Sequence, residues 1–184
     1  MRCGLSIDGD MTTRTCGAAA FAVAAAVACN KGLEPALAPT SCPQGFVGVC
    51  GTVSFVGQVP ESTARVFVVA FDTFPKSQND LFKFKPQPTP PNLPLGGPAF
   101  FYTLPLPPAR YEWVLAVWQK QGTLSPTNAD SLLRETGFYR DKGDTTAHGS
   151  GIVIVNAGTG KDSIDFVVDF NNMHRVCYYF PPCP

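Results

Sequence analysis

The chain has 184 residues and a formal net charge of 0, from 14 basic and 14 acidic side chains. This length suits one domain of ordinary size. Because no surplus of positive charge would attract a phosphate backbone, we expect no binding to nucleic acid. The 18 Pro, the 17 Gly and a charged fraction of only 15% favour a turn-rich β-domain over a helical one.

Residues 11–28 have the pattern of an export signal. One positive charge, at Arg14, precedes an uncharged run of small and apolar residues from Cys16 to Ala28. A helix of about 13 residues spans roughly 20 Å, which is less than the ~30 Å of a bilayer core. The run therefore predicts a signal peptide rather than a membrane-spanning helix. Acidic residues in the first ten positions fit a signal poorly, so we take Met11 as the better start; the alternative is a longer leader.

The signal ends in Ala26-Val27-Ala28-Cys29, which resembles the lipobox of bacterial lipoproteins, although Ala26 stands where Leu is usual. The resemblance implies that Cys29 is acylated after cleavage, which would anchor the protein to a membrane of the bacterial cell envelope. Residues 29–41 would then form a lipidated tether and residues 42–184 the folded domain. The alternative is cleavage near Ala28 without a lipid, which would give a secreted or periplasmic protein.

Four cysteines lie in the predicted domain: Cys42, Cys50, Cys177 and Cys183. An even number in an oxidising compartment predicts disulfides, and three pairings are possible. Bonds between the two ends of the domain would close loops of over about 100 residues and stabilise more in the chain-entropy model, so we expect at least one such bond. The cysteine spacings do not match those of zinc sites, so we predict no metal and no other cofactor.

Six strands are predicted by apolar periodicity, over residues 51–57, 64–71, 100–104, 111–118, 150–155 and 163–170. The run 64–71 is almost continuously apolar, as expected of a central strand. In 163–170, Ile164, Phe166, Val168 and Phe170 point to one face, which predicts one buried and one wet side. Residues 128–134 are the one segment that favours a short helix.

The connection 72–98 is long and rich in proline, which is unusual within a compact domain. It carries Phe74, Phe82 and Phe84. These rings either cover one end of the domain or form a recognition loop for an envelope protein or a glycan. Trp113 and Trp118, five residues apart on one strand, are expected on opposite faces. One would face the core and the other a second surface, under the long connection or exposed; we name Trp118 as a possible binding residue.

The order of these motifs resembles that of carboxypeptidase regulatory-like, prealbumin-like domains. The matching positions are Gly51-x-Val53-x-Phe55-x-Gly57, Pro60, Arg65 to Ala70, Tyr102-x-Leu104, Leu106 to Tyr111 and Val114 to Val117. The resemblance covers about residues 50–170 and implies a seven-stranded antiparallel β-sandwich with no catalytic residues. Ala109 stands where the family usually has Gly. The family commonly supplies accessory or binding modules to exported bacterial proteins.

No catalytic motif is complete in the sequence. Around Ser150, the pattern Gly-x-Ser-x-Gly of hydrolases fails because His148 and Ile152 occupy the glycine positions. We therefore predict a non-enzymatic binding or accessory module of the cell envelope. The alternatives are a purely structural subunit of an envelope complex, and a hydrolase or transthyretin-like enzyme with an unrecognised site.

Overall fold

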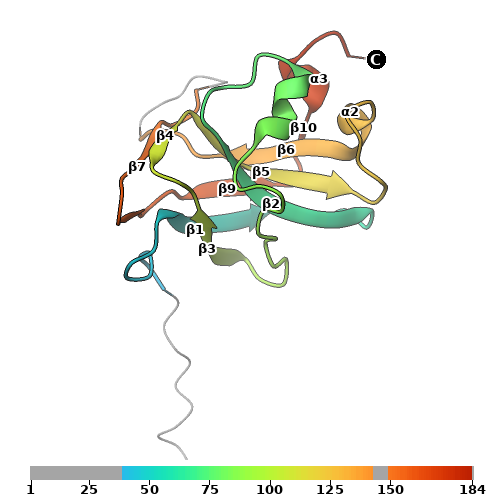
Figure 1. Ribbon diagram of the computed structural model, residues 1–184. Coiled ribbons are helices and arrows are strands. Elements are labelled where there is room, and N and C mark those ends of the chain that lie inside the picture. The colour runs from blue at the N-terminus through green and yellow to red at the C-terminus, as the bar shows by residue number, and fades with distance from the viewer. Residues whose placement is uncertain (1–38, 143–148, 184) are drawn as a thin grey trace, which may run out of the picture. The chain divides into compact units, whose positions relative to one another are not determined.

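The computed structural model describes residues 39–142 and 149–183. These residues contain ten strands and three short helices (Figure 1). The strands are β1 (Gly48–Val56), β2 (Thr63–Phe71), β3 (Ala99–Pro105), β4 (Ala109–Tyr111), β5 (Trp113–Lys120), β6 (Leu133–Phe138), β7 (Val153–Val155), β8 (Gly160–Lys161), β9 (Phe166–Asp169) and β10 (His174–Arg175). The helices are the 3-10 helix η2 (Gln78–Lys83) and the α-helices α2 (Ala129–Leu132) and α3 (Val176–Tyr179). The predicted all-β class is confirmed.

Strand pairing builds two four-stranded sheets and one two-stranded sheet. In sheet A, β1 pairs with β3 on one side and with β8 and β9 on the other, and β8 and β9 run parallel to β1. Sheet B has the order β10-β6-β5-β2, and all its pairs are antiparallel. β4 and β7 pair only with each other. In Figure 1, η2 and α3 lie together on one side of the strands.

The main core is shared by sheets A and B, and alternating strand residues build it. The strand residues with this role include Val49 and Val53 of β1, Val66, Val68 and Ala70 of β2, Val114, Ala116 and Trp118 of β5, and Phe166 and Val168 of β9. The predicted buried face of residues 163–170 is confirmed, because Ile164, Phe166, Val168 and Phe170 are all buried. Val167, between them, is 50% exposed on the wet side.

Sheet B is apolar on its second face as well. Phe67, Val69 and Phe71 of β2 and Trp113 and Leu115 of β5 form a separate buried cluster there. This explains why residues 64–71 are apolar almost without interruption, since β2 is covered on both faces. The same alternation places Trp118 in the main core and Trp113 on the opposite face, as predicted for two tryptophans five residues apart.

The prediction of seven antiparallel strands is not confirmed, because β1 has two parallel neighbours and the described residues hold ten strands. The sequence did not indicate β4 as a separate strand, and it did not indicate β6, β8 or β10. The predicted helix 128–134 is shorter than expected: α2 ends at Leu132 and β6 begins at Leu133. The expectation of a single helix was also wrong, since η2 lies within the 72–98 connection and α3 follows β10.

The four domain cysteines form two local disulfides, Cys42–Cys50 and Cys177–Cys183, so the expected bond between the two ends is wrong. The paired Cα atoms are 5.4 and 4.8 Å apart. Cys50 belongs to sheet A, whereas Cys177 lies in α3, whose Tyr179 packs on the outer face of sheet B. A disulfide requires Cα atoms within about 7 Å, and sheet B separates the two ends. Each bond therefore fixes a short terminal segment.

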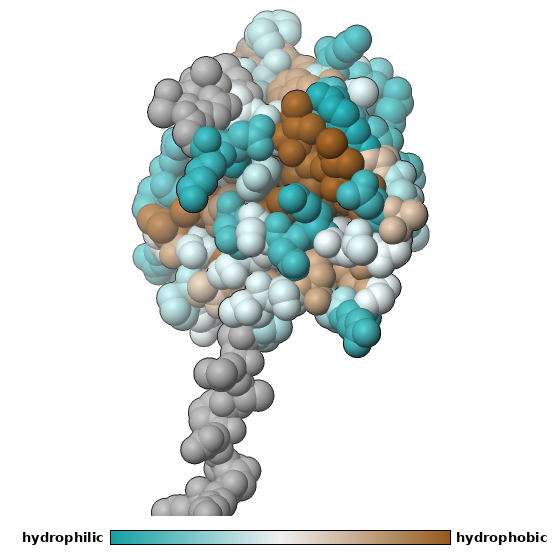
Figure 2. All heavy atoms as spheres, turned by 90° about the vertical axis from the view of Figure 1, so that its left-hand side faces the viewer, coloured by the Kyte–Doolittle hydropathy of each residue, from teal (hydrophilic) through white to brown (hydrophobic). Residues whose placement is uncertain are grey.

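Figure 2 shows apolar side chains gathered on the face of the molecule that carries β4 and β7. Ile152 and Ile154, two residues apart, are 45% and 57% exposed there. Polar side chains surround this patch in Figure 2. Two isoleucines are far less surface than the roughly 800 Å² per partner of a stable interface, so this patch alone predicts no partner.

The predicted signal peptide, Cys29 and the tether as far as residue 38 lie outside the described residues, as does His148. All the residues that the structure describes belong to one compact unit. Among them, no helix is long and apolar enough to cross a membrane.

Candidate functional site

The candidate site is a pocket of about 90 Å³ on the outer face of sheet B. Its floor is the apolar row that alternation places on this face, with Phe67 and Val69 from β2 and Leu115 and Val117 from β5. The walls come from η2, from the start of β6, and from β10 with the segment that follows it. An apolar sheet face normally packs on another layer. Here the covering layer is not closed, and a pocket remains.

One wall of the pocket is the proline-rich connection 72–98, which packs its rings inward. The Phe74 ring lies 4.7 Å from the ring of Trp113, and Leu81 and Phe84 pack on the same cluster. Phe82 is half-buried and lines the pocket. The Phe74 and Phe84 rings therefore cover the outer face of sheet B, and not one end of the domain as predicted. Phe82 and Phe84 also contribute to a concave surface.

Backbone hydrogen bonds hold this connection against the free edge of β2. The Lys85 and Ala70 backbones exchange two bonds of 2.8 and 2.9 Å, and the Leu93 N–H donates to the Val66 carbonyl at 2.7 Å. Because an unpaired edge strand invites pairing with another chain, this cover also protects β2.

Two carboxylates fix the start of the connection. Glu112 Oε2 accepts from the Phe74 N–H at 3.0 Å. That bond and the Arg110 guanidinium hold the pKa of Glu112 below its usual range. At η2, hydrogen bonds from Lys83 and Ser77 lower the pKa of Asp80 to about 2. Both carboxylates are thus charged at neutral pH and hold the wall in place.

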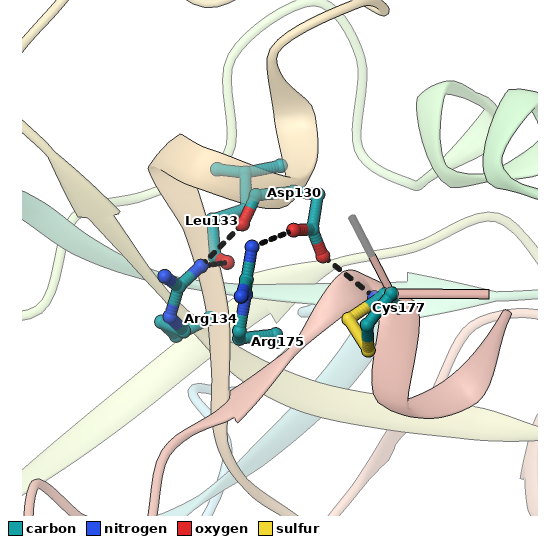
Figure 3. Close-up of a disulfide and its surroundings, with 6 residues drawn as sticks. Asp130, Leu133, Arg134, Arg175 and Cys177 are labelled. Atoms are coloured by element: carbon teal, nitrogen blue, oxygen red, sulfur yellow. Dashed lines mark hydrogen bonds and ion pairs between the residues drawn. A yellow bond between two sulfur atoms is a disulfide. The ribbon is translucent and has the colours of Figure 1, made fainter. Parts of the chain in front are cut away.

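The opposite wall is the C-terminal segment, which α2 and a disulfide hold in position (Figure 3). The Asp130 carboxylate of α2 accepts from the Cys177 N–H at 2.7 Å and pairs with the Arg175 guanidinium. The Cys177–Cys183 disulfide then ties the chain that follows α3 back to the helix. These contacts place the Tyr179 ring 5.2 Å from the ring of Trp113.

A polar cluster of Glu135, His174 and Tyr179 lies along one side of the pocket. Glu135 Oε2 accepts from the Tyr179 hydroxyl at 2.9 Å and lies 2.8 Å from His174 Nδ1. β10 brings His174 opposite Glu135 of β6, and the Glu135 side chain is only 6% exposed. A buried carboxylate needs such partners, because burying an unpaired charge costs several kcal/mol.

Burial raises the pKa of the Tyr179 hydroxyl far above its usual 10.0, and the neighbouring charge of Glu135 adds to the effect. The folded protein therefore retains this proton at a pH where the unfolded chain loses it. It follows that the free energy of unfolding falls as pH rises above about 10. We expect Tyr179→Phe to flatten this fall, as measured by urea unfolding between pH 8 and 11. Parallel profiles for the two proteins would contradict the prediction.

The far end of the pocket holds Arg65. Its Nε donates to Gln119 Oε1 at 2.9 Å, and its guanidinium carbon lies 4.4 Å from the centre of the Phe67 ring. Within the described part of the chain, no carboxylate forms an ion pair with Arg65. The arrangement leaves the terminal N–H groups of this half-buried guanidinium for another acceptor.

The predicted site residues have separate places in this arrangement. Phe74 and Phe84 pack on Trp113 and its neighbours, and Phe82 lines the pocket. The expectation that Trp118 binds a ligand was wrong: it is 4% exposed in the main core, where its indole N–H donates to Thr63 Oγ1 at 2.7 Å. It was Trp113 that came to lie under the connection.

Sequence reasoning missed Glu135, His174 and Tyr179. Glu135 and His174 are 39 residues apart, and no spacing motif joins them. The sequence did hold one sign of Tyr179. Three consecutive aromatic residues, Tyr178 to Phe180, are unusual in a solvent-exposed tail, so they predict that this segment packs against the domain.

The described residues contain one group of potential metal ligands, formed by Cys42, Cys50 and Asp162. Its two sulfur atoms are joined in a disulfide, so they are not thiolate ligands. The chemistry of the pocket is that of apolar contact, with the polar cluster of Glu135, His174 and Tyr179 on one side and Arg65 at the far end.

Comparison with known proteins found no family model, no curated protein and no solved structure that matches this chain.

Proposed function

We propose that this chain is a non-enzymatic binding module of the bacterial cell envelope, and that its pocket receives one apolar side chain of a partner protein. The carrying observation is the size and lining of the pocket on sheet B. At about 90 Å³ it is smaller than an engineered cavity of about 150 Å³ that binds benzene, and far below the 300–1,000 Å³ of pockets for whole small molecules. Buried pockets of this kind hold the anchor residues of protein interfaces.

The lining favours a protein partner over the glycan that was the other candidate. The floor and the wall from η2 are aliphatic or aromatic, with Phe67, Leu115 and Phe82 as examples. A sugar would leave the hydroxyl groups that face this floor and this wall without hydrogen-bond partners, at a cost of about 1–3 kcal/mol each. An apolar side chain loses no hydrogen bonds on entering.

The cellular setting of this proposal comes from the sequence and the disulfides. Two disulfides in a domain of this size support an oxidising compartment. A lipid on Cys29 would tether the domain to the membrane, and the fold would be a variant of the prealbumin-like β-sandwich. The pairing of sheets A and B around one core supports that relationship.

A hydrolytic function at this pocket would have to use the Glu135–His174 pair, and the surroundings of the pair disfavour this. No Ser, Thr or Cys lines the pocket among the residues described. Glu135 is also engaged by Tyr179. A nucleophile within hydrogen-bond reach of the histidine is the arrangement that such chemistry requires.

The test is to fill the pocket without changing the rest of the surface. Val117→Phe adds a ring to the half-buried floor, and Val56→Phe makes the same change at a position that is 44% exposed and does not line the pocket. Both proteins should keep the near-ultraviolet circular dichroism of a folded domain. We expect affinity capture from the envelope fraction of the native host to recover one protein with the wild type and Val56→Phe, and at least tenfold less with Val117→Phe. Equal recovery with all three would refute the proposal.

A further inference from the structure

The pocket lining has more positive than negative side chains, and this excess indicates which charge the ligand carries beside its apolar group. Three arginines line the pocket, Arg65, Arg134 and Arg175, against one acid, Glu135. Glu135 already accepts from Tyr179 and lies against His174. A ligand that carries a negative charge therefore matches this lining better than a neutral or positive one.

Two of the three arginines are already engaged by the protein. Arg175 pairs with the Asp130 carboxylate. Arg134 Nη1 donates to the carbonyls of Asp130 and Leu133 at 2.6 and 2.7 Å (Figure 3). Arg65 differs, because its partner Gln119 takes only the Nε proton. Its terminal N–H groups form the planar fork that binds a carboxylate through two parallel hydrogen bonds.

The position of Arg65 limits where that carboxylate can sit on the ligand. Its guanidinium rests on the Phe67 ring, and Phe67 is part of the pocket floor. A carboxylate hydrogen-bonded to Arg65 thus lies next to whatever contacts Phe67. Successive Cα atoms are about 3.8 Å apart, so an apolar side chain and a carboxylate on the same residue or on direct neighbours reach both sites without any folded structure in the partner.

We infer that the pocket binds the C-terminal residue of a partner protein, with its apolar side chain over Phe67 and Val117 and its terminal carboxylate on Arg65. The inference rests on the proposed function and adds the chemistry of the partner. A C-terminal residue is the one place in a protein where an apolar side chain and a carboxylate share the same Cα. It also reaches a half-covered pocket without a second chain segment having to leave on the far side.

Three short probes test this, each titrated into ¹⁵N-labelled protein and followed by amide shifts of the pocket strands. N-acetyl-leucine carries the apolar group and the terminal carboxylate. N-acetyl-leucine amide carries the apolar group alone. N-acetyl-leucyl-glutamate amide places the acid on a neighbouring side chain. We expect N-acetyl-leucine to bind at least fivefold more tightly than the other two.

Variants of Arg65 complete the test. Arg65→Gln should reduce the affinity for N-acetyl-leucine to that of its amide, and Arg65→Lys should retain only part of the preference because it lacks the fork. Equal binding of acid and amide, an unchanged preference in Arg65→Gln, or tighter binding of the glutamate probe would each overturn the inference. Those results would leave the proposed apolar pocket standing. If none of the three probes changes the amide shifts of the pocket strands at millimolar concentration, both the inference and the proposed function are refuted.

Discussion

Replacing Trp113 by Ala should lower the free energy of unfolding by about 3–5 kcal/mol, the range for a buried Trp or Phe truncated to Ala. Trp113 is 2% exposed, and its ring contacts four others: Phe71, Phe74, Phe138 and Tyr179. These rings come from sheet B, from the 72–98 connection and from the C-terminal segment. Truncation would therefore loosen both walls of the pocket along with the cluster. Chemical unfolding gives the free energy, and hydrogen exchange of η2 and α3 shows the loss of the walls.

The two tryptophans offer a matched comparison that isolates hydrogen bonding from packing. Within the described residues, the Trp113 indole N–H is the one buried side-chain polar group without a hydrogen-bond partner. The Trp118 indole N–H donates to Thr63. Because an unpaired buried donor is costly, Trp113→Phe removes a penalty while Trp118→Phe removes a bond. We expect Trp118→Phe to be the more destabilising, by about 1 kcal/mol or more. The reverse order would show that ring size dominates at both positions.

Gly137→Ala should destabilise the domain by about 3 kcal/mol or more, because no side chain fits at this point of contact between the sheets. Gly137 has φ of 154°, and a Cβ there would lie 1.8 Å from the Val167 carbonyl oxygen of β9. Real Cβ atoms do not approach so closely, so β6 and β9 would have to separate. The change combines backbone strain with overpacking, each costing about 1–3 kcal/mol.

Gly96→Ala is the control for that substitution. Gly96 lies in the exposed connection. A Cβ at this position would have no atom within 4 Å, and its φ is not in the left-handed region. Reduced freedom of the unfolded chain should leave this variant neutral or more stable by up to about 1 kcal/mol. Thermal unfolding of both variants is the measurement. Similar melting temperatures for the two would show that the sheets can part at Gly137 without cost.

The strands that the sequence predicted are those whose own residues show a β-strand pattern, either alternating or continuously apolar. β2 and β5 are rich in β-branched and aromatic residues, and the alternation of residues 163–170 separates a buried from a wet face. β6 was not predicted because its sequence, Leu133-Arg-Glu-Thr-Gly-Phe138, has no such pattern. Its strand form depends on pairing with β5 and β10. The buried Thr136 donates to the Ala116 carbonyl of β5, and the buried Glu135 has its partners on β10 and α3. Polar residues in a strand are satisfied by neighbours that local sequence does not reveal.

The all-β class and the presence of disulfide-forming cysteines follow from composition, periodicity and spacing. These properties depend on each segment alone. The disulfide pairing and the pocket do not. Chain entropy favoured bonds between the ends, but the ends lie on different sides of sheet B, and a disulfide bridges only a few ångströms. Glu135, His174 and Tyr179 likewise meet only because β10 pairs with β6 and α3 turns back over the sheet. Contacts between distant segments are fixed by packing of the whole domain, so only the tertiary structure decided them.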